Sequence, residues 1–431
     1  MIPDPLPLGA RRLARMSDVA GENWSRNIRY SAARLVAPRT VDELREVVAA
    51  SDSVKALGSR HSFTRIADTS GTLVSTAELD LPVQVDAAQK RVRVGGGVRY
   101  GELAQELDRQ GWALANLASL PHISVAGAVS TGTHGSGVAN RSLAAAVTGL
   151  DLVTSTGDLV RISEEDEELA GAVVGLGALG IVTTVELAIE PTYDIAQTVY
   201  ENVPLEAVRK AFDVIAGSAY SVSLFTTFRD EMYVDQVWRK ERTDAAATPI
   251  PAALRDREAA GALHPLPGVS AASCTVQGGK AGRWLDRLPH FRLEFTPSNG
   301  EELQSEFLVP FADAVGAFDA VHELADRLKP VLQVCEVRTI AGDELWLSPS
   351  SGRDSVAFHF TWTADEAGVA EVLPELEAAL ARFDARPHWG KVFTPRDPAE
   401  LYPRWADFVA LQRRFDPRGA FVNDYLRALG L

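Results

Sequence analysis

The first group of residues with chemical potential is the segment A-L-G-S-R-H-S at residues 56–62. Gly58 lets the backbone approach a ligand closely or adopt a positive φ. The hydroxyl and guanidinium groups around it are hydrogen-bond donors, and His61 offers a neutral imidazole nitrogen as a nucleophile or ligand. Taken alone, the segment fits an ordinary polar turn equally well.

A second segment, S-L-P-H-I-S-V-A-G-A-V-S-T-G-T-H-G-S-G at residues 119–137, changes this balance. It holds four glycines and six hydroxyl residues in nineteen positions. Unobstructed backbone N–H groups and hydroxyls are what a long polyanion such as a dinucleotide pyrophosphate needs. Its histidines, His122 and His134, fit hydrogen-bonded structural elements of such a loop better than reactive groups.

A third group follows from alternation along extended chain. Residues 355–363 read S-V-A-F-H-F-T-W-T, so His359 and Thr361 share a polar face opposite a row of apolar side chains. Glu336 and Arg338 share a face because they are two residues apart, and residues 291–296 repeat the alternation. Three such strands predict an antiparallel sheet with helices on its apolar side. The polar side could simply face water, but it mixes both charges with hydroxyls, which suits a ligand that carries several hydroxyl groups.

The elements that position these groups have their own signals. Thr40 to Glu43 is a capping-box pattern that opens a helix, residues 54–57 form the strand before the histidine turn, and residues 91–95 alternate as a strand. Residues 100–110 predict a helix, residues 150–162 a hairpin and residues 181–189 a buried strand. No G-x-G-x-x-G motif follows a strand, so the chain is predicted to be α+β rather than a doubly wound dinucleotide fold.

At Pro191 the sequence changes from many short predicted strands to longer alternating strands and amphipathic helices, which predicts a domain boundary. We expect a cofactor-binding part over residues 1–190, a substrate-binding cap over residues 191–385, and a return to the cofactor-binding part over residues 386–431. Residues 243–269, rich in Pro and Ala, predict a surface insertion.

Composition excludes several classes of function. The 431 residues carry a formal net charge of −15, which disfavours nucleic acid and anionic membranes as partners. The N-terminus lacks the apolar segment of a signal peptide, and no stretch is apolar enough to span a membrane. Cys274 and Cys335 show no metal-type or redox-type spacing, so we predict two thiols and no metal site. We expect a monomeric, cytoplasmic protein.

The histidine turn with R-H-S and the glycine-rich segment together resemble the vanillyl-alcohol-oxidase type of FAD enzyme, over nearly the whole chain, and most closely its alditol (xylitol/sorbitol) oxidase branch. The resemblance implies a two-domain fold in which an FAD-binding domain is covered by a cap with an antiparallel sheet. It implies that His61 carries FAD covalently through the 8α-methyl group. It also implies cofactor contacts from Ala56, Leu57, Gly58, Ser59, Arg60, Ser62, Ser119, Ser124, Gly127, Ala128, Val129, Ser130, Ile181 and His388. Where many relatives have a second glycine before the histidine, this chain has G-S-R, which predicts a change in the turn on the phosphate side.

The same resemblance implies the substrate side. Ser119, Glu336, Arg338, Thr361 and Lys391 correspond to substrate-binding positions, and His359, Lys391 and Arg338 to catalytic ones. The implied reaction converts the terminal primary alcohol of an alditol to the aldose and reduces O2 to H2O2. His359, with an ordinary pKa of about 6.5, is the first candidate for the base, with Lys391 as the alternative. A sugar-1,4-lactone oxidase or dehydrogenase of the same fold is the alternative enzyme, and a flavin- or carbohydrate-binding protein without turnover is the alternative class.

Overall fold

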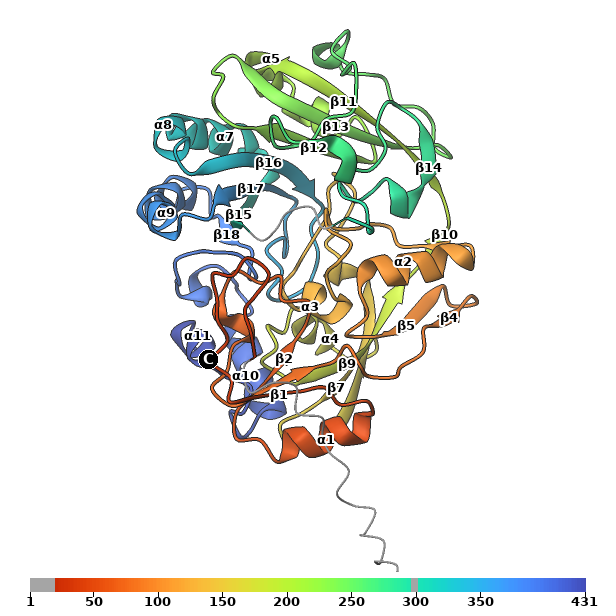
Figure 1. The fold of residues 1–431 in the computed structure, drawn as a ribbon, viewed down its shortest axis with the longest axis vertical. Helices are drawn as coiled ribbons and strands as arrows, with labels where there is room; N and C mark the ends of the chain where they lie inside the picture. The colour runs from red at the N-terminus through yellow and green to blue at the C-terminus, as the bar shows by residue number, and fades with distance from the viewer. Residues whose placement is uncertain (1–19, 296–300) are drawn as a thin grey trace, which may run out of the picture.

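The computed structural model describes residues 20–295 and 301–431. Three sheets make up most of its strand content: a small parallel sheet, a five-stranded sheet and an eight-stranded antiparallel sheet. The eight-stranded sheet occupies the upper part of the molecule in Figure 1, and the other two lie below it. This mixture of separate helices and antiparallel strands agrees with the predicted α+β class.

The parallel sheet positions the histidine turn. Its strands stand in the order β1 (Arg34–Val36), β3 (Thr72–Ser75), β2 (Val54–Leu57). The predicted helix is α1 (Val41–Ala49), where the Thr40 side chain accepts a hydrogen bond from the backbone N–H of Glu43 over 3.1 Å. The helix buries Leu44, Val47 and Val48, and β2 then delivers the chain directly into the turn at residues 58–62.

The five-stranded sheet carries the glycine-rich segment on its connections. Its order is β4 (Gln84–Asp86), β5 (Arg91–Gly95), β9 (Ile181–Ala188), β7 (Val147–Val153), β8 (Leu159–Ser163). Between β5 and β7 the chain forms α2 (Tyr100–Arg109), β6 (Trp112–Ala113) and α3 (Val125–Ser130), and α4 (Leu169–Ala172) follows β8. β6 pairs with β10 (Glu190–Pro191) outside this sheet. The β7–β8 pairing confirms the predicted hairpin.

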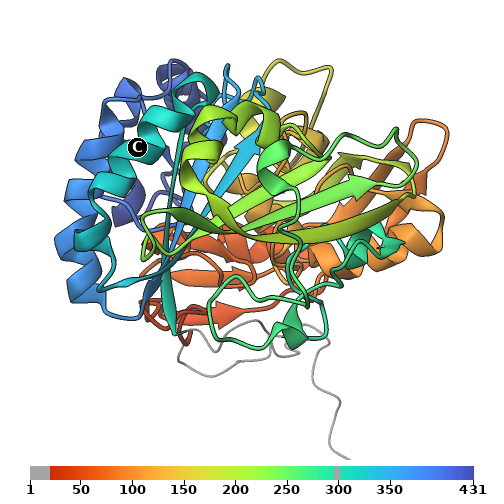
Figure 2. The same ribbon diagram turned by 90° about the horizontal axis from the view of Figure 1, so that it is seen from above.

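The eight-stranded sheet contains the predicted polar strands. Its order is β14 (Ala281–Arg283), β11 (Asp194–Pro204), β13 (Tyr233–Arg242), β12 (Ser221–Thr226), β16 (Leu332–Ile340), β17 (Ser355–Thr363), β15 (Glu302–Pro310), β18 (Arg386–Pro387). The helices of this part are α5 (Leu205–Lys210), α6 (Phe212–Ala216), α7 (Ala314–Glu323), α8 (Ala325–Leu328) and α9 (Glu366–Ala381). Helices α7 and α9 pack against β15, and α9 also packs against β17; in the view from above, the cyan and blue helices lie along one side of the sheet (Figure 2).

One predicted strand is wrong. Residues 293–294 form a turn, and Phe291 makes only an isolated bridge to Cys274; Thr296 lies outside the described residues. The strand that pairs with β17 at this edge is β15 instead. Alternation over six residues is too short to separate a strand from a turn, and the structure buries no alternating face here, since Phe291 and Leu293 are half-buried and Phe295 is exposed.

The C-terminal segment closes the parallel sheet. After β18, helices α10 (Trp405–Phe415) and α11 (Asp424–Ala428) follow. The backbone N–H of Val54 donates to Ala420 O over 2.8 Å, and Lys55 Nζ lies 3.2 Å from Phe421 O. Cys274 and Cys335 are free and buried, as predicted. Within residues 20–295 and 301–431, none of the helices has the length and apolar character that crossing a membrane requires.

Candidate active site

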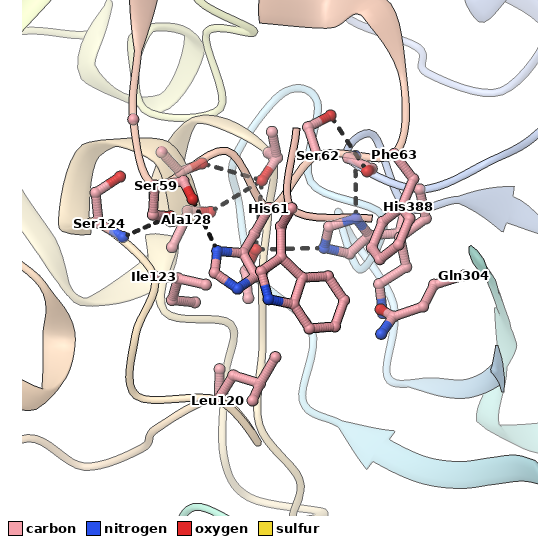
Figure 3. Close-up of a pocket in the computed structure, with 18 of the residues that line it drawn as sticks. Ser59, His61, Ser62, Phe63, Leu120, Ile123, Ser124, Ala128, Gln304 and His388 are labelled. Carbon is pink, nitrogen blue, oxygen red and sulfur yellow. Dashed lines mark hydrogen bonds between the residues drawn. The ribbon is translucent and has the colours of Figure 1, made fainter. Parts of the chain in front are cut away.

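A single large cavity joins the histidine turn, the glycine-rich segment and the polar faces of β16 and β17. Its empty volume, including the open mouth, is about 1950 Å³. Its lining extends from the histidine turn to the polar strands, so a cofactor at one end and a substrate at the other would share it. The close-up shows Ser59 and Ser124 on one side of His61 and His388 and Gln304 on the other (Figure 3).

Nearly all the residues predicted for cofactor and substrate line this cavity. They are Ala56, Leu57, Gly58, Ser59, Arg60, His61, Ser62, Ser119, Ser124, Gly127, Ala128, Ser130, Glu336, Arg338, His359, Thr361, His388 and Lys391. Val129 and Ile181 do not line it. Both are fully buried in hydrophobic clusters behind the wall, which their neighbours Ala128, Gly180 and Val182 form.

His61 is held by its own turn and by an aromatic neighbour. Its Nδ1 lies 3.0 Å from the carbonyl oxygen of Ser59, and its ring stacks on Trp24 with 5.1 Å between centroids. A carbonyl oxygen only accepts, so Nδ1 carries the hydrogen and the other ring nitrogen keeps its lone pair. Burial lowers the pKa of His61 to about 4, so the ring is neutral at pH 7. Arg60 adopts a φ of 64°, and its guanidinium donates to the carbonyl of Ala20 over 2.6 Å.

The glycine-rich wall leaves no room for larger residues. A Cβ on Gly58 or Gly127 would lie 2.6 Å or 2.7 Å from Ser124 Oγ. A Cβ on Gly96 would lie 2.8 Å from the carbonyl oxygen of Val182. Ser124 Oγ is itself buried and makes no hydrogen bond to the described residues. Bare backbone beside an unpartnered hydroxyl fits a phosphate-bearing cofactor such as FAD.

The substrate-side residues meet at the other end of the cavity. Arg338 NH1 donates to Ser119 Oγ over 3.3 Å, and Arg338 Nε lies 3.7 Å from Glu336 Oε1. His359 Nε2 lies 3.3 Å from Thr361 Oγ1, while its Nδ1 is hydrogen-bonded to Lys391 Nζ. Strand pairing explains the gathering, because β16 and β17 stand in a register that places Glu336 opposite His359.

Glu306 is the functional residue that the sequence analysis missed. It is 1% exposed, and its register on β15 places it opposite His359, in one row with Glu336. Its carboxylate accepts from Lys391 Nζ over 2.7 Å and from Arg338 NH2, and lies 3.3 Å from His134 Nε2. An acidic residue two positions after Gln304, directly before the apolar run F-L-V, was the available signal. His134 therefore contacts the charged group, whereas His122 Nε2 pairs with the backbone carbonyl of Leu293 over 2.8 Å.

Charge and burial set the protonation states at this end. Burial alone would raise the pKa of Glu306 and Glu336, but neighbouring cations overcome it and hold both carboxyls ionised, Lys391 and Arg338 for Glu306 and Arg338 for Glu336. Burial lowers the pKa of His359 to about 4, and the Lys391 charge adds to this. Burial also lowers the pKa of Lys391, which Glu306 partly offsets. A neutral imidazole thus lies against an amine of reduced basicity, a pair that can accept and store one proton.

His388 and His290 complete the wall. His388 Nδ1 accepts from the backbone N–H of Gly390 over 3.1 Å, and burial holds the pKa of its ring well below the ordinary value. His290, which no sequence motif singles out, lines the cavity and pairs through Nε2 with Glu336 Oε1 over 2.7 Å.

Comparisons with known proteins agree with this geometry. Residues 32–163 match a family described as an FAD binding domain, and residues 299–429 match one described as D-arabinono-1,4-lactone oxidase. An alditol oxidase of a Streptomyces species is 51% identical over 94% of this chain and 98% of its own. An L-gulono-1,4-lactone dehydrogenase of Mycobacterium tuberculosis is 28% identical over 94% of this chain and 97% of its own. A cholesterol oxidase structure from B. sterolicum superposes with a TM-score of 0.79 at 14% identity, covering 100% of both chains, which confirms the predicted fold.

Proposed function

The chain belongs to the alditol oxidase family of FAD-dependent oxidoreductases, and from this premise we propose that it oxidises the terminal primary alcohol of alditols such as xylitol and sorbitol to the aldose, reducing O2 to H2O2. The observation that carries the proposal is the single cavity where the His61 turn meets the polar faces of β16 and β17. Hydrogen-bond donors and acceptors both line its far end, and the hydroxyls of a polyol both donate and accept.

FAD would be held by the histidine turn, by Ser119, by Ser124 to Ser130 and by His388. When bound, it supplies a hydride acceptor for the alcohol carbon and passes the electrons to O2. We assign His61 as the covalent attachment point, through the 8α-methyl group of the flavin. The support is its neutral, partly restrained ring with a free nitrogen lone pair beside the wall that fits the cofactor.

Three side chains orient the substrate. Glu336 accepts from polyol hydroxyls, Arg338 donates to them, and Thr361 does either. Ser119 shares a hydrogen bond with Arg338 and so lies at the same end of the cavity. Binding several hydroxyls at once orients the substrate before the reaction, so less entropy is lost in reaching the transition state.

His359 and Lys391 take the hydroxyl proton together. Lys391 must first give up its proton: in the resulting receptive state, which the lowered pKa of both groups makes more accessible, Lys391 is a neutral amine and His359 carries its proton on Nδ1. The hydroxyl proton enters at His359 Nε2, beside Thr361, and the Nδ1 proton passes to Lys391 Nζ. Glu306, 2.7 Å from that nitrogen, stabilises the ammonium that forms, and Arg338 stabilises negative charge on the alcohol oxygen.

A polyol panel with peroxide detection tests the activity. Purified protein should show a flavin spectrum that bleaches on anaerobic addition of xylitol or sorbitol, and in air each turnover should yield H2O2. Because residues 299–429 match a D-arabinono-1,4-lactone oxidase family, L-gulono- and L-galactono-1,4-lactone belong in the same panel. Faster turnover of a lactone would replace the proposed substrate, and absence of bleaching with both classes would leave a binding protein.

Acid precipitation tests the attachment. Protein carrying covalent flavin keeps its yellow colour in the acid pellet, whereas His61→Ala should release the colour into the supernatant. Colour that stays with the His61→Ala pellet would remove this residue from the linkage.

A further inference from the structure

Lys240 is a buried lysine that takes no part in the proposed mechanism, and burial lowers its pKa to about 7. It lies on β13, is 1% exposed, and its ammonium is surrounded by acceptors. Lys240 Nζ donates to the carbonyl of Leu288, lies 3.4 Å from that of Pro289, and lies 3.1 Å from His290 Nδ1. Three acceptors match the three N–H groups of an ammonium. Burying a charged amine costs free energy unless its N–H groups are hydrogen-bonded, which these three acceptors provide.

His290 connects this lysine to the candidate active site. Its Nε2 lies 2.7 Å from Glu336 Oε1, and a carboxylate only accepts, so Nε2 must carry a hydrogen. Burial lowers the pKa of His290 to about 4, and the charge of Lys240 adds to this, so the ring is neutral and Nδ1 holds a lone pair. Lys240 donates to that lone pair. The two contacts of the ring therefore admit one tautomer.

The packing around His290 prevents the ring from adjusting by rotation. Trp238 meets it edge to face with 5.2 Å between centroids, and Phe225 does so at 5.5 Å. The backbone N–H of His290 also donates to the carbonyl of Ser119 over 3.1 Å. The two aromatic rings also contact each other, with 5.4 Å between centroids, so they hold His290 from one side. With the ring restrained there and at its backbone, the position of the proton decides whether Glu336 receives a hydrogen bond.

We propose that Lys240 is a positioning residue for substrate binding: it fixes His290 as the Nε2–H tautomer, so that His290 holds Glu336 with one of its oxygens and leaves the remaining lone pairs directed at polyol hydroxyls. The part of this inference that assigns Glu336 to polyol binding rests on the proposed function, whereas the tautomer of His290 does not. Without the lysine, Nδ1 loses its donor and only the contact with Glu336 still favours a proton on Nε2, so the ring gains access to the other tautomer, which presents a lone pair to the carboxylate.

Nitrogen NMR of the histidine rings tests the assignment directly. The holoenzyme is labelled with ¹⁵N-histidine, and the His290 signals are identified by their loss in His290→Gln. We expect the protonated nitrogen to couple to both carbon-bound ring protons, the pattern of Nε2–H. A proton on Nδ1, or an imidazolium, in the wild-type protein at pH 7 would overturn the proposal.

Steady-state kinetics of Lys240→Met tests the consequence. Loss of a hydrogen bond to a charged group commonly changes affinity by about tenfold or more, so KM for the best polyol should rise by about tenfold while kcat changes by less than about threefold. Lys210→Met, which removes an exposed lysine (side chain 74% exposed), is the matched control and should leave both constants unchanged. An unchanged KM, or an unchanged His290 tautomer in Lys240→Met, would refute the role of the lysine. The NMR spectra require no turnover. If the protein oxidised no alditol, the proposed function would be refuted, but the tautomer of His290 would still be tested by the spectra.

Discussion

Replacing Glu306 by glutamine probes the charge arrangement on which the candidate site depends. The carboxylate is 1% exposed and lies 2.7 Å from Lys391 Nζ, and it also accepts from Arg338. Glutamine keeps the shape and one acceptor oxygen but leaves two buried cations without their common counter-charge. Removing one partner of a buried ion pair costs about 3–5 kcal/mol.

The expected change in Tm follows from the size of the chain. At about 2.1 cal/mol/K per residue, unfolding 431 residues in one transition has an entropy of about 0.9 kcal/mol/K. The destabilisation therefore corresponds to a fall in Tm of about 3–6 °C at pH 7. Thermal unfolding of the holoprotein, followed by circular dichroism and by flavin fluorescence, measures it.

The pH dependence gives the same substitution a second signature. Lys391 and Arg338 overcome the effect of burial and hold the pKa of Glu306 well below its ordinary value. A carboxyl with a depressed folded pKa stabilises the fold above its unfolded pKa of about 4.3 and loses that contribution as the pH falls towards the folded value. The difference in Tm between wild type and Glu306→Gln should therefore be largest near neutral pH and shrink below about pH 4.

A matched control separates the effect of burial on Tm from the effect of losing any one carboxylate. Glu375 pairs with Arg327 on the surface, 2.7 Å apart, with its side chain 42% exposed. Because solvent screens exposed pairs, Glu375→Gln should keep Tm within about 1 °C of the wild type. If Glu306→Gln loses no more stability than Glu375→Gln, the reasoning about a buried counter-charge is wrong.

Three other substitutions probe the cavity. His359→Ala should lower the rate of flavin reduction in stopped-flow experiments by about 10²–10⁴-fold, since it removes the proton acceptor; a near-normal rate would leave the proton to Lys391 alone. Glu336→Gln should raise KM for the best polyol by about 10–100-fold through loss of a charged acceptor, and an unchanged KM in steady-state assays would contradict its assignment to the substrate. Gly96→Ala would place a Cβ 2.8 Å from the carbonyl oxygen of Val182 and 2.9 Å from Ala126 Cβ, so the flavin-to-protein absorbance ratio of the purified variant should fall; full loading would show that this wall tolerates displacement without affecting the cofactor.

Local patterns predicted the elements that hold the site. The cap at Thr40 and the apolar run into Gly58 were readable because helix caps and strand ends depend on a few neighbouring residues. The polar face shared by His359 and Thr361 was readable for the same reason, since side chains alternate along any extended strand. The family resemblance, rather than these patterns, supplied the roles assigned to them.

What local patterns could not supply was register. Glu306, His359 and Glu336 form one row only because β15, β17 and β16 pair with particular offsets, and no property of residues 302–310 alone fixes them. The contact between His290 and Glu336 has the same origin, since it joins a loop to a strand 46 positions away. The predicted strand at residues 291–296 failed for the converse reason, because a turn can imitate a short alternation.

The contacts of residues 420–423 with the parallel sheet make the histidine turn depend on a remote part of the chain. The backbone N–H of Val54 and the ammonium of Lys55 both bond to carbonyls within residues 420–421, and Asn423 Nδ2 donates to the carbonyl of Asp68 over 2.7 Å. These partners lie more than 350 positions away in the sequence, so the strand that carries the histidine turn is complete only once residues 420–423 have packed against it. A cut in the chain before residue 420 would leave that strand without these partners, and retention of the flavin should fall although no described residue beyond Lys391 lines the cavity.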